Sequence, residues 1–204
     1  MSVLEHVAKL PSLWEAASAM RKWSEGLFRH SLLVADLAAE VAEALGFSRQ
    51  EVELARLGGL LHDFGKVTWP REMAHKHPLL DEDRELVRLH PLVGAKLVEE
   101  RVPGVSGVVL RVIREHHERD GGNGYPRGLR APDLHPLSRV VACVEVFAAL
   151  TERRSYRPVD FTPEQAFAVL HEDGFDGELI DALRRVLSGR EGAARPAPGA
   201  AAGP

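Results

Sequence analysis

The chain has 204 residues, enough for one domain with a full hydrophobic core, and its 45% apolar and 27% charged residues are typical of a globular protein. A net charge of −4 disfavours bulk DNA or RNA binding, which needs a broad basic surface, whereas a small nucleotide requires only local cations. The single cysteine, Cys143, excludes a disulfide framework and a thiolate zinc cluster within one chain.

Nothing in the sequence predicts export or membrane insertion. Glu5, His6 and Lys9 come before any apolar run could begin, so the N-terminus lacks the pattern of a signal peptide. No stretch approaches the roughly 18 consecutive apolar residues that a membrane span requires. We therefore expect a cytoplasmic protein that does not enter a membrane.

Apolar residues recur at helical spacing along almost the whole chain and nothing strong favours strands, so the sequence predicts an all-α fold. Gly46 ends the first strong helix, and Ser48 with Glu51 forms a capping-box pattern that begins the next. Pro91 should break a later helix, because the residue before a proline avoids helical backbone angles. The expected helices are, in chain order, 27–45, 48 to about 65, 81–89, a restart at Pro91, 106–119, 137–150, 162–171 and 177–187.

Three segments are expected along the chain. Residues 1–26 form an N-terminal helical extension, in which Trp14 and Trp23 are apolar enough for a helical cap or a dimer surface. Residues 27–188 form one domain. Residues 189–204 consist mainly of Ala, Gly and Pro, which predicts a disordered tail.

The sequence LLHDFGK, residues 60–66, carries the first candidate chemistry. His62 and Asp63 follow an apolar run, where an unpaired buried carboxylate would be costly. A metal ion removes that cost, since imidazole and carboxylate are usual ligands of transition metals, and one of two adjacent side chains can bridge two ions. Lys66 is close enough to offer a positive charge to a bound phosphate. The alternative is a helix C-cap with an incidental His-Asp pair.

Further histidines take inward or terminal positions on other predicted helices. His30 shares an apolar stripe with Val34, and His90 stands at the predicted break. His116 and His117 end an amphipathic helix just before a glycine-rich loop, which suggests that a ligand lies between the helix and the loop. Each of these histidines alone also fits an ordinary core or helix-end position.

Glu145 is the only charged residue in VVACVEVFAAL, residues 140–150, a segment that is apolar nearly all round. A buried carboxylate there requires a cation or a hydrogen-bond partner. A metal ion is a natural partner, and an ion pair with an arginine is the alternative. Imidazoles and carboxylates without thiolates favour iron or manganese, with zinc also compatible, and two such ions can activate a water for phosphoryl displacement. The candidate metal ligands are His30, His62, Asp63, His90, His116, His117 and Glu145.

The order of these motifs resembles the HD-GYP family of the HD phosphohydrolase superfamily, over roughly residues 27–158. The matching segments are HSLLVADLA at 30–38, LLHDFGK at 60–66, HPLVG at 90–94, HHERDGGNGYP at 116–126 and VEVFAALTERRSYRP at 144–158. A bare HD motif is weak evidence, but this ordered series is highly specific. The resemblance implies an all-α HD-domain helical bundle with a metal centre between its helices.

The resemblance also implies an activity, the hydrolysis of the bacterial second messenger cyclic di-GMP to pGpG or on to GMP with two or three iron or manganese ions. By this resemblance Asp63 bridges the ions, and Asp63 and Lys66 are the catalytic residues. The loop that contains Tyr125 would approach the substrate or a protein partner, and a homodimer is a further expectation. The implied substrate-binding residues are Lys66, Gly124, Tyr125, Pro126, Arg154 and Arg157.

The sequence departs from the family pattern at several positions. Glu145 replaces a usual aspartate, and Gly121 occupies the position of the loop aspartate, with Asp120 one residue early. Leu33 replaces a usual arginine. Gly26 stands where members with a third ion carry a glutamate, so two ions are expected.

These departures leave three functions open. The first is a cyclic di-GMP phosphodiesterase. The second is a weak or inactive sensor or interaction module, which binds the nucleotide or a protein partner without turnover, and the altered carboxylates motivate it. The third is a hydrolase of another nucleotide or phosphate ester. A purely structural helical protein would have to bury Asp63 and Glu145 without a metal.

Overall fold

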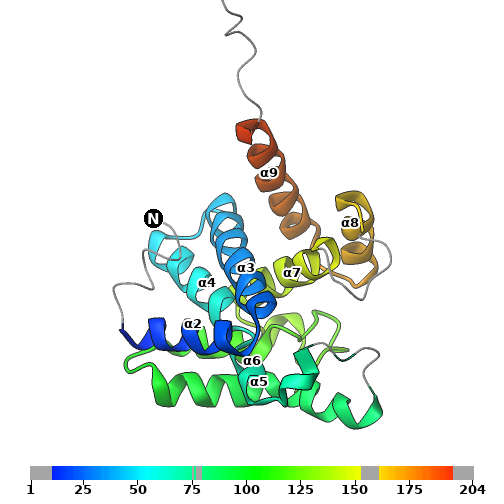
Figure 1. Ribbon diagram of the computed structural model, residues 1–204. Helices are drawn as coiled ribbons and strands as arrows, with labels where there is room; N and C mark the ends of the chain where they lie inside the picture. Colours follow the sequence, from blue (N-terminus) through cyan, green and yellow to red (C-terminus); the bar gives the residue numbers. More distant parts are fainter. Residues whose placement is uncertain (1–10, 75, 77–79, 153–160, 195–204) are drawn as a thin grey trace, which may run out of the picture.

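The computed structural model is helical, as the sequence predicts (Figure 1). It describes residues 11–74, 76, 80–152 and 161–194, and within these ranges there is no strand, only an isolated bridge between Gly121 and Arg130. The α-helices are α2 (Pro11–Trp23), α3 (Glu25–Ala44), α4 (Arg49–Leu61), α5 (Asp81–Arg101), α6 (Gly107–Glu115), α7 (Pro136–Thr151), α8 (Pro163–Glu172) and α9 (Gly177–Ala194). The 3₁₀ segments are η1 (Phe64–Thr68), η2 (Arg71–Ala74) and η3 (Ala131–Asp133).

Local signals in the sequence set several helix boundaries. The Ser48 hydroxyl accepts from the Glu51 N–H while the Glu51 carboxylate accepts from the Ser48 N–H, so the predicted capping box is confirmed. Gly46 follows α3 with φ 81°, a left-handed conformation that glycine adopts without strain and that ends helices. Ser106 caps α6 by accepting from the Val108 N–H.

The predicted break at Pro91 is wrong, because α5 runs through it to Arg101. Proline lacks the backbone donor that would bond the carbonyl four residues earlier. That carbonyl belongs to Val87, and it accepts a hydrogen bond from the His90 ring at 2.6 Å. The helix therefore continues with one backbone hydrogen bond replaced by a side-chain one.

Two helices end earlier than the apolar periodicity predicts. α4 stops at Leu61 and not near Gly65, and the next residues wind into the 3₁₀ segment η1. α6 stops at Glu115 and not at Arg119, and the chain then turns toward the glycine-rich loop. Both early ends leave candidate ligands in turns, where their side chains are not tied to a helical face.

The helices at the two ends of the described chain, α2 and α9, refine the expected segments. α2 buries Leu13, Ala16, Ala17 and Met20 in an apolar core that it shares with η1, α5 and parts of α3, α4 and α6. α9 continues to Ala194, so residues 189–194 of the predicted tail are helical, and residues 195–204 lie outside the described part of the chain.

Two apolar cores share α3, α4 and α6. The first joins these helices to α7, α8 and α9, and the second joins them to α2, η1 and α5 (Figure 1). α7 is buried on successive positions from Val140 to Glu145, which confirms the prediction of a helix buried nearly all round. In the described part of the chain, no helix is both long and apolar enough to cross a membrane.

Glycines allow two pairs of backbone segments to approach each other closely, η1 with α5 and α4 with α3. A Cβ atom on Gly65 would lie 2.1 Å from the His90 carbonyl oxygen, and one on Gly94 would lie 2.8 Å from the Gly65 nitrogen. A Cβ atom on Gly59 would lie 2.9 Å from the Ala35 Cα. These contacts hold η1 on α5 and α4 on α3, and so they set the positions of the candidate ligands.

We expect the substitution G65A to destabilise the protein by about 1–3 kcal/mol, because the added methyl group meets a backbone atom that cannot move aside alone. The free energy of unfolding, measured with a chemical denaturant, tests this. The matched control is G107A, at an exposed position on α6 where a Cβ atom meets nothing within 4 Å. Equal stabilities of the two variants would contradict the close-packing argument.

Candidate metal centre

Segments far apart in the sequence bring five histidines and an aspartate together. His30 lies in the second turn of α3, and His62 and Asp63 directly follow α4. His90 lies within α5, and His116 directly follows α6. His117 is the next residue after His116 and is partly exposed, whereas the other five side chains are buried. We call this set the cluster: His30, His62, Asp63, His90, His116 and His117.

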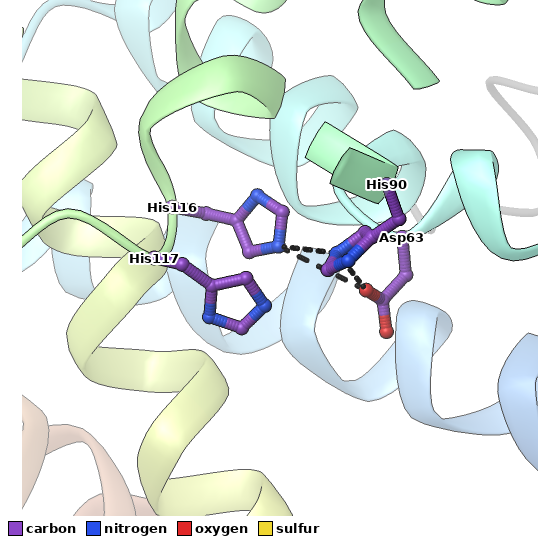
Figure 2. Close-up of side chains that lie close together, drawn as sticks. All are labelled: Asp63, His90, His116 and His117. Carbon is purple, nitrogen blue, oxygen red and sulfur yellow. Dashed lines mark hydrogen bonds and ion pairs between the residues drawn. The ribbon is translucent and has the colours of Figure 1, made fainter. Parts of the chain in front are cut away.

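The cluster consists of two groups that share Asp63. The first group is Asp63, His90, His116 and His117, and the second is His30, His62 and Asp63; in each, the candidate ligand atoms lie within 4.8 Å of one another. Asp63 Oδ1 is 3.1 Å from His90 Nε2, whereas Oδ2 is 3.3 Å from His62 Nε2. Figure 2 shows the first group, with the carboxylate facing the rings of His90 and His116. One carboxylate oxygen is thus directed at each group.

Three of the rings are held in the same way, through Nδ1 to the carbonyl three residues earlier. The distances are 2.7 Å from His62 to Gly59, 2.6 Å from His90 to Val87 and 2.8 Å from His116 to Ile113. A carbonyl oxygen can only accept, so each Nδ1 donates its proton. In a neutral ring the lone pair is then on Nε2, the atom that faces the cluster.

The charge of Asp63 is balanced by neighbouring cations. Burial would raise the pKa of this carboxyl, but the Lys66 ammonium and the His62 ring outweigh that effect and hold the pKa well below its usual value. The Lys66 Nζ donates to Asp63 Oδ2 at 2.6 Å while its side chain stays 23% exposed. Asp63 is therefore an ionised carboxylate in the interior, with a lysine between it and solvent.

The rings of the first group are neutral, because burial and then the neighbouring imidazoles hold the pKa of His116 and that of His117 well below the usual value. Burial also lowers the pKa of His90, despite the opposing effect of Asp63. His62 differs: burial lowers its pKa, but the carboxylates of Asp63 and Glu145 outweigh this and raise it. Neutral imidazoles are the form that binds metal ions.

The arrangement fits a divalent cation. His90 Nε2 and His116 Nε2 are 3.2 Å apart, and since both rings donate through Nδ1, two lone pairs face each other. His62 Nε2 and Asp63 Oδ1 are buried and make no hydrogen bond to any residue that the structure describes. A cation in the first group would satisfy Asp63 Oδ1 and the two facing nitrogens, and a cation in the second group would satisfy His62 Nε2. A donor set of nitrogen and oxygen suits iron, manganese or zinc.

Glu152 is a functional candidate that sequence reasoning missed. Its carboxylate pairs with His30 Nδ1 at 2.5 Å, which leaves His30 Nε2 for the cluster. A carboxylate that orients a metal-binding histidine in this way is common in metalloproteins. Glu152 directly follows α7, and a glutamate at the end of a helix is too common for the sequence alone to single it out.

The glycine-rich loop folds back onto the turn that carries His116 and His117. A Cβ atom on Gly124 would lie 2.5 Å from the Glu118 Cα and from the His117 carbonyl, so only glycine fits there. The Tyr125 N–H donates to that carbonyl at 3.0 Å, and the Tyr125 ring stacks on the His117 ring at 4.5 Å between centroids. Tyr125 therefore lies beside the cluster.

Glu118 holds this loop and was given no role by the sequence. Its side chain is 2% exposed, and its two oxygens accept from the N–H groups of Arg127 at 2.7 Å and Leu129 at 2.9 Å. The signal was present in the motif HHE, where Glu118 follows the paired histidines, but a loop contact nine residues away has no local pattern.

One predicted metal ligand is not in the cluster. Glu145 is buried on α7, as predicted, and its charge acts on His62, but its carboxylate belongs to neither group of close ligand atoms among the described residues. Arg154 and Arg157 lie outside the described residues.

Comparison with known proteins gives a consistent family. The HD domain family model matches residues 10–179. The 3'3'-cGAMP-specific phosphodiesterase 1 of Vibrio cholerae is 38% identical over 79% of the chain, and the cyclic di-GMP phosphodiesterase response regulator RpfG of Xanthomonas campestris is 35% identical over 73%. These alignments cover 38% and 40% of the two relatives, so the chain spans less than half of their length.

A solved structure is similar as well. Bd1817, an HDG"Y"P protein from Bdellovibrio bacteriovorus, superposes with a TM-score of 0.65 and 27% identity, over 78% of this chain and 51% of that one.

We expect the substitution E118Q to loosen the loop, because an amide has one accepting oxygen where the carboxylate has two. Hydrogen exchange at the Arg127 or Leu129 amide should accelerate by about tenfold or more, since hydrogen bonds to a charged group contribute about 1.5–3 kcal/mol. Amide exchange followed by NMR measures this. The control is E172Q at the exposed end of α8. Unchanged protection in E118Q would show that the loop is held by other contacts.

Proposed function

The chain belongs to the HD domain family, and we propose that it is a metal-dependent phosphodiesterase that hydrolyses a cyclic dinucleotide. One observation carries the proposal: the two oxygens of a buried, ionised Asp63 are directed at two groups of imidazoles whose ligand nitrogens face inward. Two divalent ions held there would activate a water and stabilise both oxygens of an in-line phosphoryl displacement. Iron or manganese is the proposed metal, with zinc compatible.

The proposed roles follow from the two groups. Asp63 would serve both ions, His90, His116 and His117 would hold one of them, and His30 and His62 would hold the other. Glu145 is proposed as a further ligand of the second site, supported by its burial and by its effect on the pKa of His62.

Lys66 is the proposed contact to the scissile phosphate. Its ammonium bonds Asp63, yet the side chain remains partly exposed, so the same charge is available to an anion that enters the site. A positive group next to the reacting phosphate stabilises the charge that develops during displacement. Lys66 therefore serves both the buried carboxylate and the substrate in this proposal.

The glycine loop is the proposed cover of the substrate site. Gly124 and Pro126 shape it, and the Tyr125 ring lies on His117, where one edge can contact a nucleotide. Burial raises the pKa of Tyr125, which keeps its hydroxyl protonated and able to donate. Arg154 and Arg157 are further proposed contacts, on the strength of the sequence motif alone.

The choice of nucleotide is part of the proposal. The named relatives act on 3'3'-cGAMP and on cyclic di-GMP, which share a guanosine and a cyclic phosphodiester frame. We propose cyclic di-GMP as the substrate, with pGpG or GMP as product, and 3'3'-cGAMP as the competing one. A cytoplasmic location fits such a messenger, and a homodimer and a protein partner at the glycine loop complete the proposal.

A specific observation favours a second candidate, a sensor that binds the nucleotide without hydrolysing it. Glu145 stands outside the two groups of close ligand atoms among the described residues, and it replaces a usual aspartate of the HD-GYP pattern. A longer side chain can leave the second site with too few ligands for turnover. Binding without product would identify this function.

We expect divalent ions to stabilise the protein. At a free ion concentration of 100 times Kd, a site present only in the folded state adds about 2.7 kcal/mol, which raises Tm by about 5–10 °C for a chain of this size. Thermal unfolding with Mn²⁺ and with a chelator measures the shift. D63N should abolish it, whereas D181N, at an exposed position on α9, should retain it.

We expect anaerobic protein loaded with Fe²⁺ or Mn²⁺ to convert cyclic di-GMP to pGpG or GMP. Chromatography of the products, with 3'3'-cGAMP, cyclic di-AMP and a simple phosphodiester in parallel, tests the reaction and the substrate class. D63N should form no detectable product, because the shared ligand loses its charge, and D181N should match the parent. Saturable binding of cyclic di-GMP with no product would contradict the phosphodiesterase proposal and support the sensor.

A further inference from the structure

Three histidines of the cluster donate through Nδ1 to a main-chain carbonyl that has no backbone N–H partner four residues on. His62 and His116 obtain one because they directly follow α4 and α6. The carbonyls of Gly59 and Ile113 lie in the last turns of these helices, where the helical ladder stops and carbonyl oxygens lack a partner four residues on. A helix end thus provides the acceptor for each of these two rings.

His90 has no helix end beside it. α5 begins nine residues before it and continues to Arg101, so the Val87 carbonyl would ordinarily accept from the N–H of residue 91. Residue 91 is a proline, which has no N–H. The His90 Nδ1 lies 2.6 Å from the Val87 oxygen, in the place of that missing donor.

We propose that Pro91 is a positioning residue, which keeps the Val87 carbonyl open so that His90 donates through Nδ1 and faces the cluster with the lone pair of Nε2. This inference rests on the proposed function, in which His90 Nε2 is a metal ligand. Proline does inside a helix what the helix ends do for His62 and His116. All three rings then share one tautomer and one type of restraint.

The geometry on the other side of His90 supports the same role. His90 Nε2 is 3.1 Å from Asp63 Oδ1 and 3.2 Å from His116 Nε2, so a small rotation of the ring would move it away from both. The His90 carbonyl is covered by Gly65, which prevents the backbone from shifting to compensate. The bond to Val87 restrains the ring about its own axis.

A backbone N–H at position 91 would compete for the Val87 oxygen and draw it along the helix axis. The substitution P91A supplies that N–H and also removes the steric clash of an internal proline. A positioning role predicts opposite effects on two quantities: the metal-free protein keeps or gains thermal stability, while the affinity for one of two metal ions falls. A role in packing alone predicts that stability falls and that any loss of affinity follows from it.

The test measures Mn²⁺ binding to the full chain, by EPR of the free ion, together with Tm of the metal-free protein. We expect P91A to lower the affinity for one of the two Mn²⁺ ions by about tenfold or more, the range seen when a group that orients a metal ligand is removed. The control is P163A, at the first position of α8, where no helical donor is lost and no affinity should change. The ¹⁵N shifts of the His90 ring report whether Nδ1 still carries the proton.

A second variant separates the missing N–H from the proline ring. An α-hydroxy acid with the alanine side chain, introduced at position 91 by nonsense suppression, has an ester oxygen in place of the N–H and no ring. It should restore the affinity and the tautomer of the parent protein. An affinity and a tautomer like those of P91A would overturn the proposal and would assign the effect to packing of the proline ring.

The two proposals fail in different ways. A parent protein that binds no Mn²⁺, Fe²⁺ or Zn²⁺ would remove the proposed function, whatever the variants do. A parent that binds two ions, with P91A binding both equally well, would remove only the role of Pro91.

Discussion

The structure depends on keeping the charged carboxylate of Asp63 in the interior. An ion with 2% of its surface exposed loses most of its hydration, and this loss must be balanced by cations or hydrogen bonds close to it. Lys66 supplies one cation from the solvent side, and imidazoles surround the rest. Such an arrangement requires that several helices deliver their side chains to one point, and the early ends of α4 and α6 make this possible.

Backbone contacts then fix where the helices meet. Gly65 lets η1 touch the His90 carbonyl, and Gly59 lets α4 lie directly on α3. Because these contacts are between main-chain atoms, they leave little freedom for the side chains attached there. The two cores on either side of α3 and α4 hold the arrangement from outside, so the polar centre is enclosed by apolar packing on both sides.

The sequence predicts this fold well where signals are local. The capping box at Ser48, the stop at Gly46 and the buried helix α7 are each set by neighbouring residues. The sequence-based prediction fails at Pro91, within the site. A proline was expected to interrupt the helix there, but the His90 ring replaces the lost backbone hydrogen bond and the helix continues. Glu152 was not predicted because its partner, His30, is 122 positions away in the chain.

The loop shows how a departure from the HD-GYP pattern can leave the site intact. The aspartate expected at Gly121 is replaced by Asp120, whose carboxylate binds Arg139 of α7 through both oxygens, and Arg139 also binds Asp176 before α9. Asp120 therefore ties the start of the loop to α7, while Glu118 holds its far end through two N–H groups. Gly124 and Tyr125 contact the turn at His117 independently of Asp120, so the part of the loop nearest the candidate metal centre does not depend on the displaced aspartate.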